Sequence, residues 1–516
     1  MSSVRTRTHR LAWEVGAWLL LALALVEWWQ RLFRGGVETY SNADILYLAT
    51  LVEDVVVRGH PFAGAWHLTP APYLFPDGLF TLLARALSPR IELVQVGTVV
   101  LQVLAAAFAA RAFLAAVTPD EDGAAALGPA VVACGVALGL HGQSTFDLFV
   151  HPAYHTGVVT VTLAAGALIV APAGRRWWPR AVAVAALCLL GGASDSLVVL
   201  WGLVLGVVAG GVAVSARRRQ RAPAVEWSAL RLSFVAAGAS LAAFVARRVA
   251  LPFPDKTHDR LRLARVPATL AQAWVDWGGY GAALQAVLPL GLVLLAALAA
   301  RGRTPHLRFA AGVSLAFAVA VLASIIATGF LNDAGWYRYL LTPSVLGLCA
   351  VAWCAPRPSA KGALTAVVGA VVLSALTPRQ WVWGAPLPDF RVRPQVACVD
   401  ALADREGAHV VLTDYWVAKP LTLLSARGVR AAQLTPEVDA PYLWITSRAW
   451  YGPFDEAGLV VTSGLDEAAV DARFGAPAEV VTCGDWRVRV YRGDGRAAVR
   501  RFLDDAVTRA IGPVPR

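Results

Sequence analysis

The sequence predicts an α-helical membrane protein of about eleven spans, followed by a small extracytoplasmic α/β domain. Of its 516 residues, 57% are hydrophobic and only 16% are charged, whereas soluble domains are about 45–50% apolar and about 25% charged. Apolar runs long enough to cross a bilayer, about 20 residues each, recur as far as Leu376 and then stop. These observations exclude disordered, collagen-like and disulfide-scaffold proteins.

The net charge of +11 would suit a nucleic-acid binder, but the position of the arginines indicates otherwise. They concentrate in short loops between apolar runs, as the positive-inside rule describes for cytoplasmic loops of membrane proteins. We therefore expect membrane lipid, and no nucleic acid, as a partner.

Nine apolar runs are each long enough for one span. They begin near Leu11, Ile91, Ala124, Thr156, Leu230, Tyr280, Phe309, Tyr339 and Gly362. A tenth stretch, Ala181–Val214, is interrupted by Gly191–Ser196 and forms either one tilted helix or a hairpin of two.

The basic loops favour the hairpin. With the N-terminus inside, eleven spans place most short basic loops in the cytoplasm. Those loops contain Arg175, Arg176, Arg180, Arg217, Arg218, Arg219, Arg221, Arg301, Arg303, Arg308, Arg357 and Lys361. A predicted outer loop with five arginines between 247 and 265 is an exception. We expect a multi-pass protein of a bacterial cytoplasmic membrane, with its C-terminus and active face outside.

Two domains follow, a transmembrane domain over residues 1–377 and an extracytoplasmic domain over 378–516. In the second, short apolar strands alternate with helical stretches, which is typical of an α/β unit. The expected strands are His409–Thr413, Tyr442–Thr446, Gly458–Thr462 and Glu479–Thr482, and the expected helices are Gln395–Glu406, Lys419–Ser425 and Asp466–Phe474.

Of the six cysteines, only Cys398 and Cys483 lie in the predicted outer domain. Two cysteines in an oxidising compartment favour a disulfide, which would join the first helix of the domain to its last hairpin. Two buried free thiols are the alternative.

The loop between the first two spans is the richest in polar groups. At about 100° per residue, Asp44, Tyr47, Asp54 and Arg58 fall on one narrow helical face. This pattern predicts an interfacial helix around residues 43–58 with its acids facing a cavity. Asp44 or Asp54 is then a candidate general base. Alternatively, Asp44 caps the helix and Asp54 forms an i,i+4 ion pair with Arg58.

A proline-rich aromatic segment, Trp66–Asp77, follows in the same loop. Its prolines predict a rigid extended loop. Its aromatic faces suit a sugar ring or a prenyl chain, or anchor the loop at the membrane interface. We expect Tyr73 and Asp77 to contact substrate, and Asp77 to open the next helix.

Further candidates lie in other outer loops. His151 and His155 are spaced i,i+4 with Pro152 in the expected first helical turn; the pair could bind a divalent metal, although hydrogen bonding to a phosphate or to neighbouring loops is favoured. Asp195, at the turn of the hairpin, either shapes a site or caps a helix. Arg338 suits a phosphate, or pairs with Asp333.

The chain resembles the GT-C superfamily of integral membrane glycosyltransferases. Asp44, just after the first span, resembles the catalytic acid in the first outer loop of that family, although Ile45 replaces the second acid of the usual pair. Arg338–Pro343 is similar to an Arg-Tyr…Pro element that enters a late span in many members. Phe474–Pro477, before the hairpin Arg487–Arg492, looks like part of their C-terminal domains.

The resemblance implies transfer of a sugar from a polyprenyl-phosphate donor to a glycan, lipid or protein acceptor at the outer face. Asp44 would be the base and Arg338 the phosphate clamp, while His151, His155 and Asp195 would shape the pocket. No cofactor follows with certainty, and a divalent metal is possible. Two alternatives remain open: a lipid or small-molecule transporter (a flippase, for example), and a catalytically inactive GT-C-like protein of envelope assembly.

Overall fold

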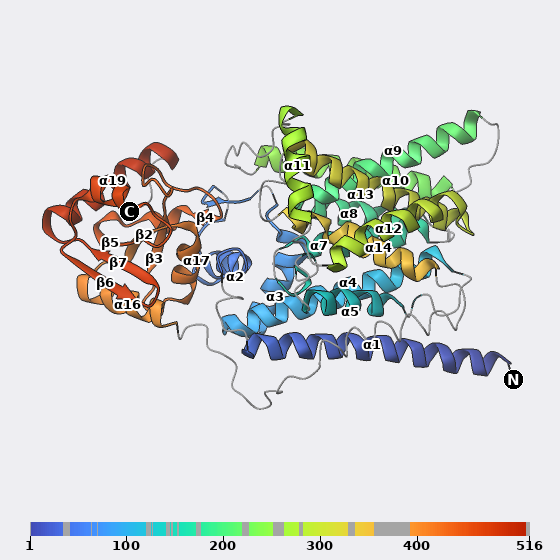
Figure 1. Ribbon diagram of the computed structural model, residues 1–516, viewed down its shortest axis with the longest axis horizontal. Helices are drawn as coiled ribbons and strands as arrows, with labels where there is room; N and C mark the ends of the chain where they lie inside the picture. The colour runs from blue at the N-terminus through green and yellow to red at the C-terminus, as the bar shows by residue number, and fades with distance from the viewer. Residues whose placement is uncertain are drawn as a thin grey trace.

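The computed structural model describes residues 2–34, 42–62, 64–69, 71–119, 125, 127–140, 145, 148–151, 154–171, 177–218, 227–250, 263–277, 282–328, 336–354 and 393–511. A bundle of long helices forms one part, and a smaller α/β domain lies beyond one end of it (Figure 1). The N-terminus lies at the opposite end of the bundle from that domain (Figure 1).

The bundle confirms that the chain is a polytopic helical protein of membrane type. Its helices are α1 (Ser2–Arg34), α4 (Ile91–Val117), α5 (Leu127–Leu140), α7 (Thr156–Val170), α8 (Trp178–Ser194), α9 (Ser196–Arg218), α10 (Trp227–Ala250), α12 (Ala282–Arg301), α13 (Pro305–Thr328) and α14 (Leu341–Cys354). Among the described residues, five helices are long and apolar enough to cross a membrane, with the stretches Leu11–Leu32, Ile91–Val117, Ser196–Arg218, Trp227–Val249 and Pro305–Thr328. The predicted span near Gly362 lies outside the described residues.

The long apolar stretch 181–214 is divided between two helices. Asp195 separates α8 from α9 with an extended backbone, φ −148° and ψ 130°. Helix α10 packs along both α8 and α9, so the stretch does not form one continuous helix.

Short elements connect these helices at the end nearest the α/β domain. They are α2 (Tyr47–Val52), the π-helical turns η1 (Glu53–Val57) and η2 (Leu74–Gly78), α3 (Leu79–Leu87), α11 (Val266–Trp277), and the 3-10 turns η3 (Leu148–Val150), η5 (Leu263–Arg265) and η7 (Trp336–Leu340). The helix expected around residues 43–58 begins only at Tyr47, and all six residues of α2 are buried. It packs against α3 and against α17 of the α/β domain, so its side chains contact protein on both sides.

The C-terminal domain contains a five-stranded mixed sheet in the order β3-β2-β5-β7-β6. Strand β2 is parallel to β3 and β5, and β7 is antiparallel to β5 and β6. Its elements are α16 (Pro394–Glu406), β2 (Val410–Thr413), α17 (Tyr415–Leu424), β3 (Arg430–Gln433), β4 (Thr446–Ser447), η8 (Arg448–Tyr451), η9 (Phe454–Glu456), β5 (Ala457–Val461), α18 (Glu467–Phe474), β6 (Glu479–Cys483), β7 (Trp486–Val490) and α19 (Gly493–Ile511).

Three expectations for this domain differ from the structure. Strand β3 was not predicted, and α17 begins at Tyr415, which is earlier than the expected Lys419. The expected strand Tyr442–Thr446 is replaced by the short β4, because only Thr446 and Ser447 pair with another strand. Cys398 and Cys483 form a disulfide with a Cα–Cα distance of 5.6 Å across 85 residues of sequence. It joins α16 to the end of β6, and the remaining four cysteines are free thiols.

The domain is joined to the loop between the first two spans. Trp66 and His67 form the short strand β1 (Trp66–His67), which pairs antiparallel with Thr446 and Ser447 of β4. An apolar cluster with residues from both sides, including Tyr47, Trp66, Tyr415 and Trp450, covers this contact. The loop after α1 and the N-terminus of α17 therefore meet beside the end of the bundle that is nearest the C-terminal domain.

Candidate functional site

Asp44 lies where the bundle meets the C-terminal domain. It belongs to a turn closed by Asn42, whose side-chain oxygen accepts the Ile45 N–H at 3.0 Å. No side chain caps α2, so Asp44 is not an N-cap. The Tyr415 hydroxyl donates to Asp44 Oδ1, and the Tyr154 hydroxyl lies 3.4 Å from Oδ2. Asp44 is half-buried.

The charges of Asp44 and Arg338 act on the same phenols. Burial raises the pKa of Tyr154 above its usual range, Asp44 raises it further, and Arg338 lowers it. Burial likewise raises the pKa of Tyr73, on which Asp195, Arg338 and Asp44 also act. The structure thus brings Asp44 and Arg338 to one group of tyrosines.

Asp54 occupies a different environment, because its side chain is only 1% exposed. Its Oδ2 accepts the indole N–H of Trp66 at 2.8 Å, and Oδ1 accepts that of Trp450 at 3.1 Å. His60 Nδ1 lies 2.9 Å from Oδ1. Arg58 instead donates to the carbonyl of Thr422 at 3.1 Å. Asp54 is almost fully buried and accepts two indole N–H groups that would lose their acceptor without it, so the residue suits a structural role better than proton transfer.

His155 and Asp195 form a buried pair, with 2% and 3% of their surface exposed. His155 Nδ1 lies 2.5 Å from Asp195 Oδ2, and its Nε2 lies 3.3 Å from the Tyr73 hydroxyl. Asp195 Oδ1 also accepts the Leu197 N–H at 2.9 Å. Asp195 therefore caps α9, as one interpretation of the sequence expected, and also contacts His155.

The proline-rich aromatic loop enters the bundle and packs against the turn between α8 and α9. The backbone N–H groups of Tyr73 and Phe75 donate to the carbonyl and hydroxyl oxygens of Ser194, at 3.2 and 2.9 Å. Asp77 does not open α3 as expected, because the helix begins at Leu79 and its N-cap is Gly78, without a side-chain cap. Asp77 instead lies in η2, is 2% exposed and accepts Gln102 Nε2 at 2.6 Å. Burial raises the pKa of Asp77 to about 7. The loop is thus anchored to protein.

His151 and His155 do not share a helical face, because α7 begins only at Thr156 and His155 has a left-handed backbone, φ 62°. His151 is 8% exposed, and its ring centroid lies 6.0 Å from that of Tyr154. In the part of the chain that the structure describes, no group of three or more His, Cys, Asp or Glu side chains is placed to hold a metal. Pro152, Asp147 and Asp333 lie outside the described residues.

Arg338 lies near His155, with the ring of Tyr339 between them. It lies in η7, directly before α14. The Arg338 guanidinium carbon is 5.3 Å from the ring centroid of Tyr339, and the Tyr339 ring lies 5.0 Å from that of His155. A cation near two phenols and an imidazole is an environment that suits an anionic oxygen.

Sequence reasoning missed Tyr415, although its position carried a signal. Tyr415 follows the carboxyl end of the parallel strand β2, where functional residues of α/β domains gather. Beneath its ring lies Lys419, which is fully buried, with Nζ 3.5 Å from the ring centroid and 3.2 Å from Gln433 Oε1.

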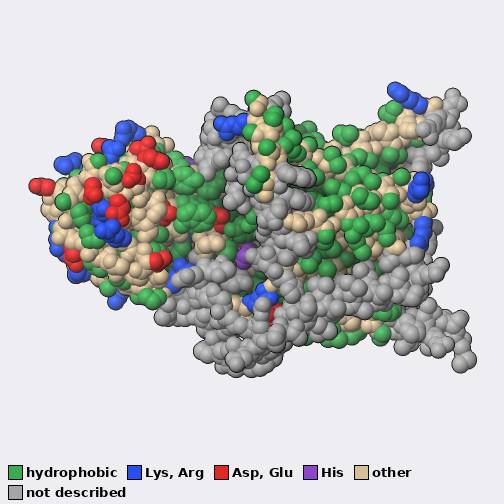
Figure 2. All heavy atoms as spheres, in the orientation of Figure 1, with side chains coloured by type: hydrophobic (Ala, Val, Ile, Leu, Met, Phe, Trp, Pro, Cys, Tyr) green, Lys and Arg blue, Asp and Glu red, His purple; other side chains and the backbone are tan. Residues whose placement is uncertain are grey.

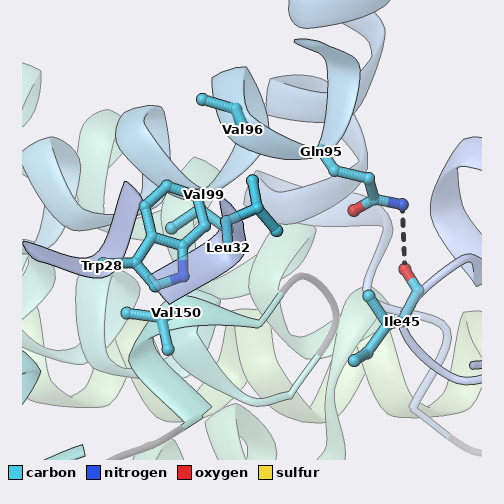
Figure 3. A pocket seen from close by; sticks show the side chains of 7 residues that line it. All are labelled: Trp28, Leu32, Ile45, Gln95, Val96, Val99 and Val150. Carbon is cyan, nitrogen blue, oxygen red and sulfur yellow. Dashed lines mark hydrogen bonds between the residues drawn. The ribbon is translucent and has the colours of Figure 1, made fainter. Parts of the chain in front are cut away.

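A small, mainly apolar pocket contains Ile45, the residue after Asp44, in its lining (Figure 3). Its lining comes from α1, from the start of α4, from the turn before α2 and from η3: Trp28, Leu32, Ile45, Gln95, Val96, Val99 and Val150. Gln95 Nε2 donates to the carbonyl of Ile45 at 3.3 Å and holds that turn against α4 (Figure 3).

Comparison with known proteins gives no relative, since no family model, curated protein or solved structure matches the chain.

Proposed function

We propose that the protein is a membrane glycosyltransferase of the GT-C type, which moves a sugar from a polyprenyl-phosphate donor to an acceptor hydroxyl. The observation that carries the proposal is the half-buried Asp44 carboxylate, held by two phenols and sharing Tyr73 and Tyr154 with the Arg338 charge. A base and a cation acting on one set of side chains are what this transfer requires.

In the proposed reaction, the acceptor oxygen attacks the anomeric carbon of the donor while its proton passes to Asp44. The bond between the anomeric carbon and the phosphate oxygen breaks, and its electron pair leaves on the phosphate, giving polyprenyl phosphate. Arg338 stabilises that negative charge. Tyr73 would contact the phosphate, since its hydroxyl is positioned by His155 and Asp195. Asp54 is left out of the chemistry because it is enclosed by two indole rings at 1% exposure, whereas Asp44 is half-buried.

The lipid-borne donor is the part of the proposal that the GT-C resemblance implies. The pocket beside Ile45 is too small to hold a prenyl chain, so a donor would approach Asp44 by another route.

The orientation is part of the proposal: eleven spans in a bacterial cytoplasmic membrane, with the N-terminus inside and the C-terminal domain outside. Lys and Arg side chains are visible at the end of the bundle farthest from the C-terminal domain (Figure 2). Arg217 and Arg218 belong to the last turn of α9, and α9 reaches the same end of the bundle (Figure 1), in keeping with the positive-inside rule for this orientation. A C-terminal tag that reacts with an impermeant reagent in intact cells supports it, and a tag reached only after lysis contradicts it.

Transfer is tested with the purified protein in nanodiscs and a panel of radiolabelled polyprenyl-phosphate sugars. We expect Asp44→Asn to abolish transfer without loss of folded protein, and the exposed Glu437→Gln to leave transfer unchanged. If Asp44→Asn transfers sugar at the wild-type rate, Asp44 is not the base. If the wild type transfers no sugar but carries the donor across liposomes, the protein is a transporter.

A further inference from the structure

The hydrogen bond between Tyr415 and Asp44 joins residues 371 positions apart in the sequence. It brings a hydroxyl of the C-terminal domain to the proposed base in the bundle. A sugar acceptor must present its own hydroxyl to the same carboxylate before transfer. An attacking hydroxyl would therefore bind to Asp44 Oδ1, where the Tyr415 hydroxyl binds in this structure.

Other aromatic side chains of the C-terminal domain surround this place. Trp416, the next residue of α17, is 57% exposed, and its ring lies edge-on to Tyr415 with centroids 5.1 Å apart. The Tyr442 ring is 6.0 Å from that of Tyr415. Burial raises the pKa of Tyr442 and the charge of Asp44 raises it further, so the Tyr442 hydroxyl also lies within electrostatic reach of Asp44.

This combination suits a carbohydrate better than a purely apolar partner. Tyrosine and tryptophan present a flat apolar face and a polar edge, which match the two kinds of surface on a sugar ring, its C–H face and its hydroxyls. Lys419 is buried beneath the Tyr415 ring and holds this wall in place from inside the domain.

We propose that the acceptor is a carbohydrate, bound by the C-terminal domain at Tyr415, Trp416 and Tyr442. Its attacking hydroxyl takes the position on Asp44 that the Tyr415 hydroxyl holds in this structure. The inference rests on the proposed function, because it takes Asp44 as the base that receives the acceptor's proton. Tyr415 is a positioning residue, which keeps Asp44 in place until the acceptor displaces its hydroxyl.

The test uses the full chain in nanodiscs, with methyl glycosides of common hexoses and pentoses as acceptor probes. A serine-containing peptide and a long-chain alcohol represent the other acceptor classes. We expect the wild type to transfer sugar to a methyl glycoside. In Trp416→Ala, the KM for that glycoside should rise about tenfold, while the rate of donor hydrolysis should not change. Trp178→Ala, which removes an indole that is 58% exposed at the start of α8, is the matched control and should behave as wild type.

Tyr415→Phe separates positioning from folding. Without the phenolic hydroxyl, Oδ1 of Asp44 is open to water, so we expect donor hydrolysis to rise relative to transfer while the melting temperature changes little. A parallel fall of hydrolysis and transfer contradicts the positioning role.

Binding of the probes is measured separately by saturation-transfer NMR, which needs no turnover. One outcome is that the wild type binds a methyl glycoside, Trp416→Ala does not bind it, and the wild type transfers no sugar. That outcome supports the carbohydrate site and contradicts the proposed reaction. If the protein transfers sugar only to the peptide or the alcohol, and Trp416→Ala does not change this transfer, the proposed reaction is supported and the carbohydrate acceptor is wrong. If Trp416→Ala instead weakens only the association of the C-terminal domain with lipid, Trp416 is a membrane anchor and the inference also fails.

Discussion

The indole N–H of Trp450 donates a hydrogen bond of 3.1 Å to Asp54, which precedes it by 396 residues. The same carboxylate accepts the indole N–H of Trp66, and the two rings meet edge-to-face with centroids 5.3 Å apart. This buried contact lies beside the β1–β4 pairing. It fixes the C-terminal domain to the loop that also carries Asp44, and so sets where Tyr415 meets its partner.

Loss of the Asp54 carboxylate should release the domain. Asp54→Leu leaves two buried indole N–H groups without their acceptor, at a cost of about 1–3 kcal/mol each. We expect a lower melting temperature and faster proteolytic separation of the C-terminal domain from the bundle. Asp505→Leu makes the same change at an exposed position of α19 and should have little effect. Equal protease resistance in the two variants would show that the contact does not hold the domain.

Asp195 performs two tasks that different substitutions separate. Asparagine still accepts the Leu197 N–H, so Asp195→Asn should keep the cap of α9 within about 0.5 kcal/mol. It no longer supplies a carboxylate to orient His155, and we expect transfer to fall about 10- to 100-fold. Asp195→Ala should lose the same activity and about 1 kcal/mol of stability as well. Transfer rates and melting curves of both variants check this, and full activity in Asp195→Asn would rule out the orienting role.

Gly157 allows the aromatic loop to approach α7. A Cβ atom at this position would lie 2.6 Å from Pro76 Cδ and 2.7 Å from Asp77 Oδ2. We expect Gly157→Ala to cost about 1–3 kcal/mol through overpacking, and to reduce transfer because the loop carries Tyr73. At Gly211 in α9 an added Cβ meets nothing within 4 Å, so Gly211→Ala should change stability by less than about 1 kcal/mol. Identical thermal stability of the two variants would contradict this account.

The buried Asp77 should make stability depend on pH. Burial raises its pKa from 3.8 to about 7 in the folded protein, so between these values the folded state holds a proton that the unfolded chain releases. The contribution of Asp77 to the free energy of unfolding is therefore fully present below about pH 4. It falls as the pH rises to about 7, by at most roughly 4 kcal/mol. Melting curves of wild type and Asp77→Asn from pH 4 to 8 isolate the effect. We expect a steeper decline in the wild type, and parallel curves would exclude it.

Local patterns were sufficient for several elements. Apolar run lengths predicted the starts of α4 and α7 at Ile91 and Thr156, because a membrane helix must be apolar along its whole length. The Gly191–Ser196 interruption marked the boundary between α8 and α9. Asp44 was singled out by its place after the first apolar run.

The partners of these residues could not be inferred from the same patterns. Asp44 and Asp54 looked alike in sequence, yet one meets two phenols at a half-buried position and the other is enclosed by indole N–H groups. His155 was matched with His151 by spacing, whereas the structure pairs it with Asp195, 40 residues away.

The sequence by itself determined that the chain is a helical membrane protein with an α/β domain, because hydrophobic length and period depend on each segment alone. Only the tertiary structure decided which acid remains accessible and that Tyr415 reaches it. Burial and hydrogen bonding depend on side chains that packing brings together from distant parts of the chain, and no local pattern records those partners.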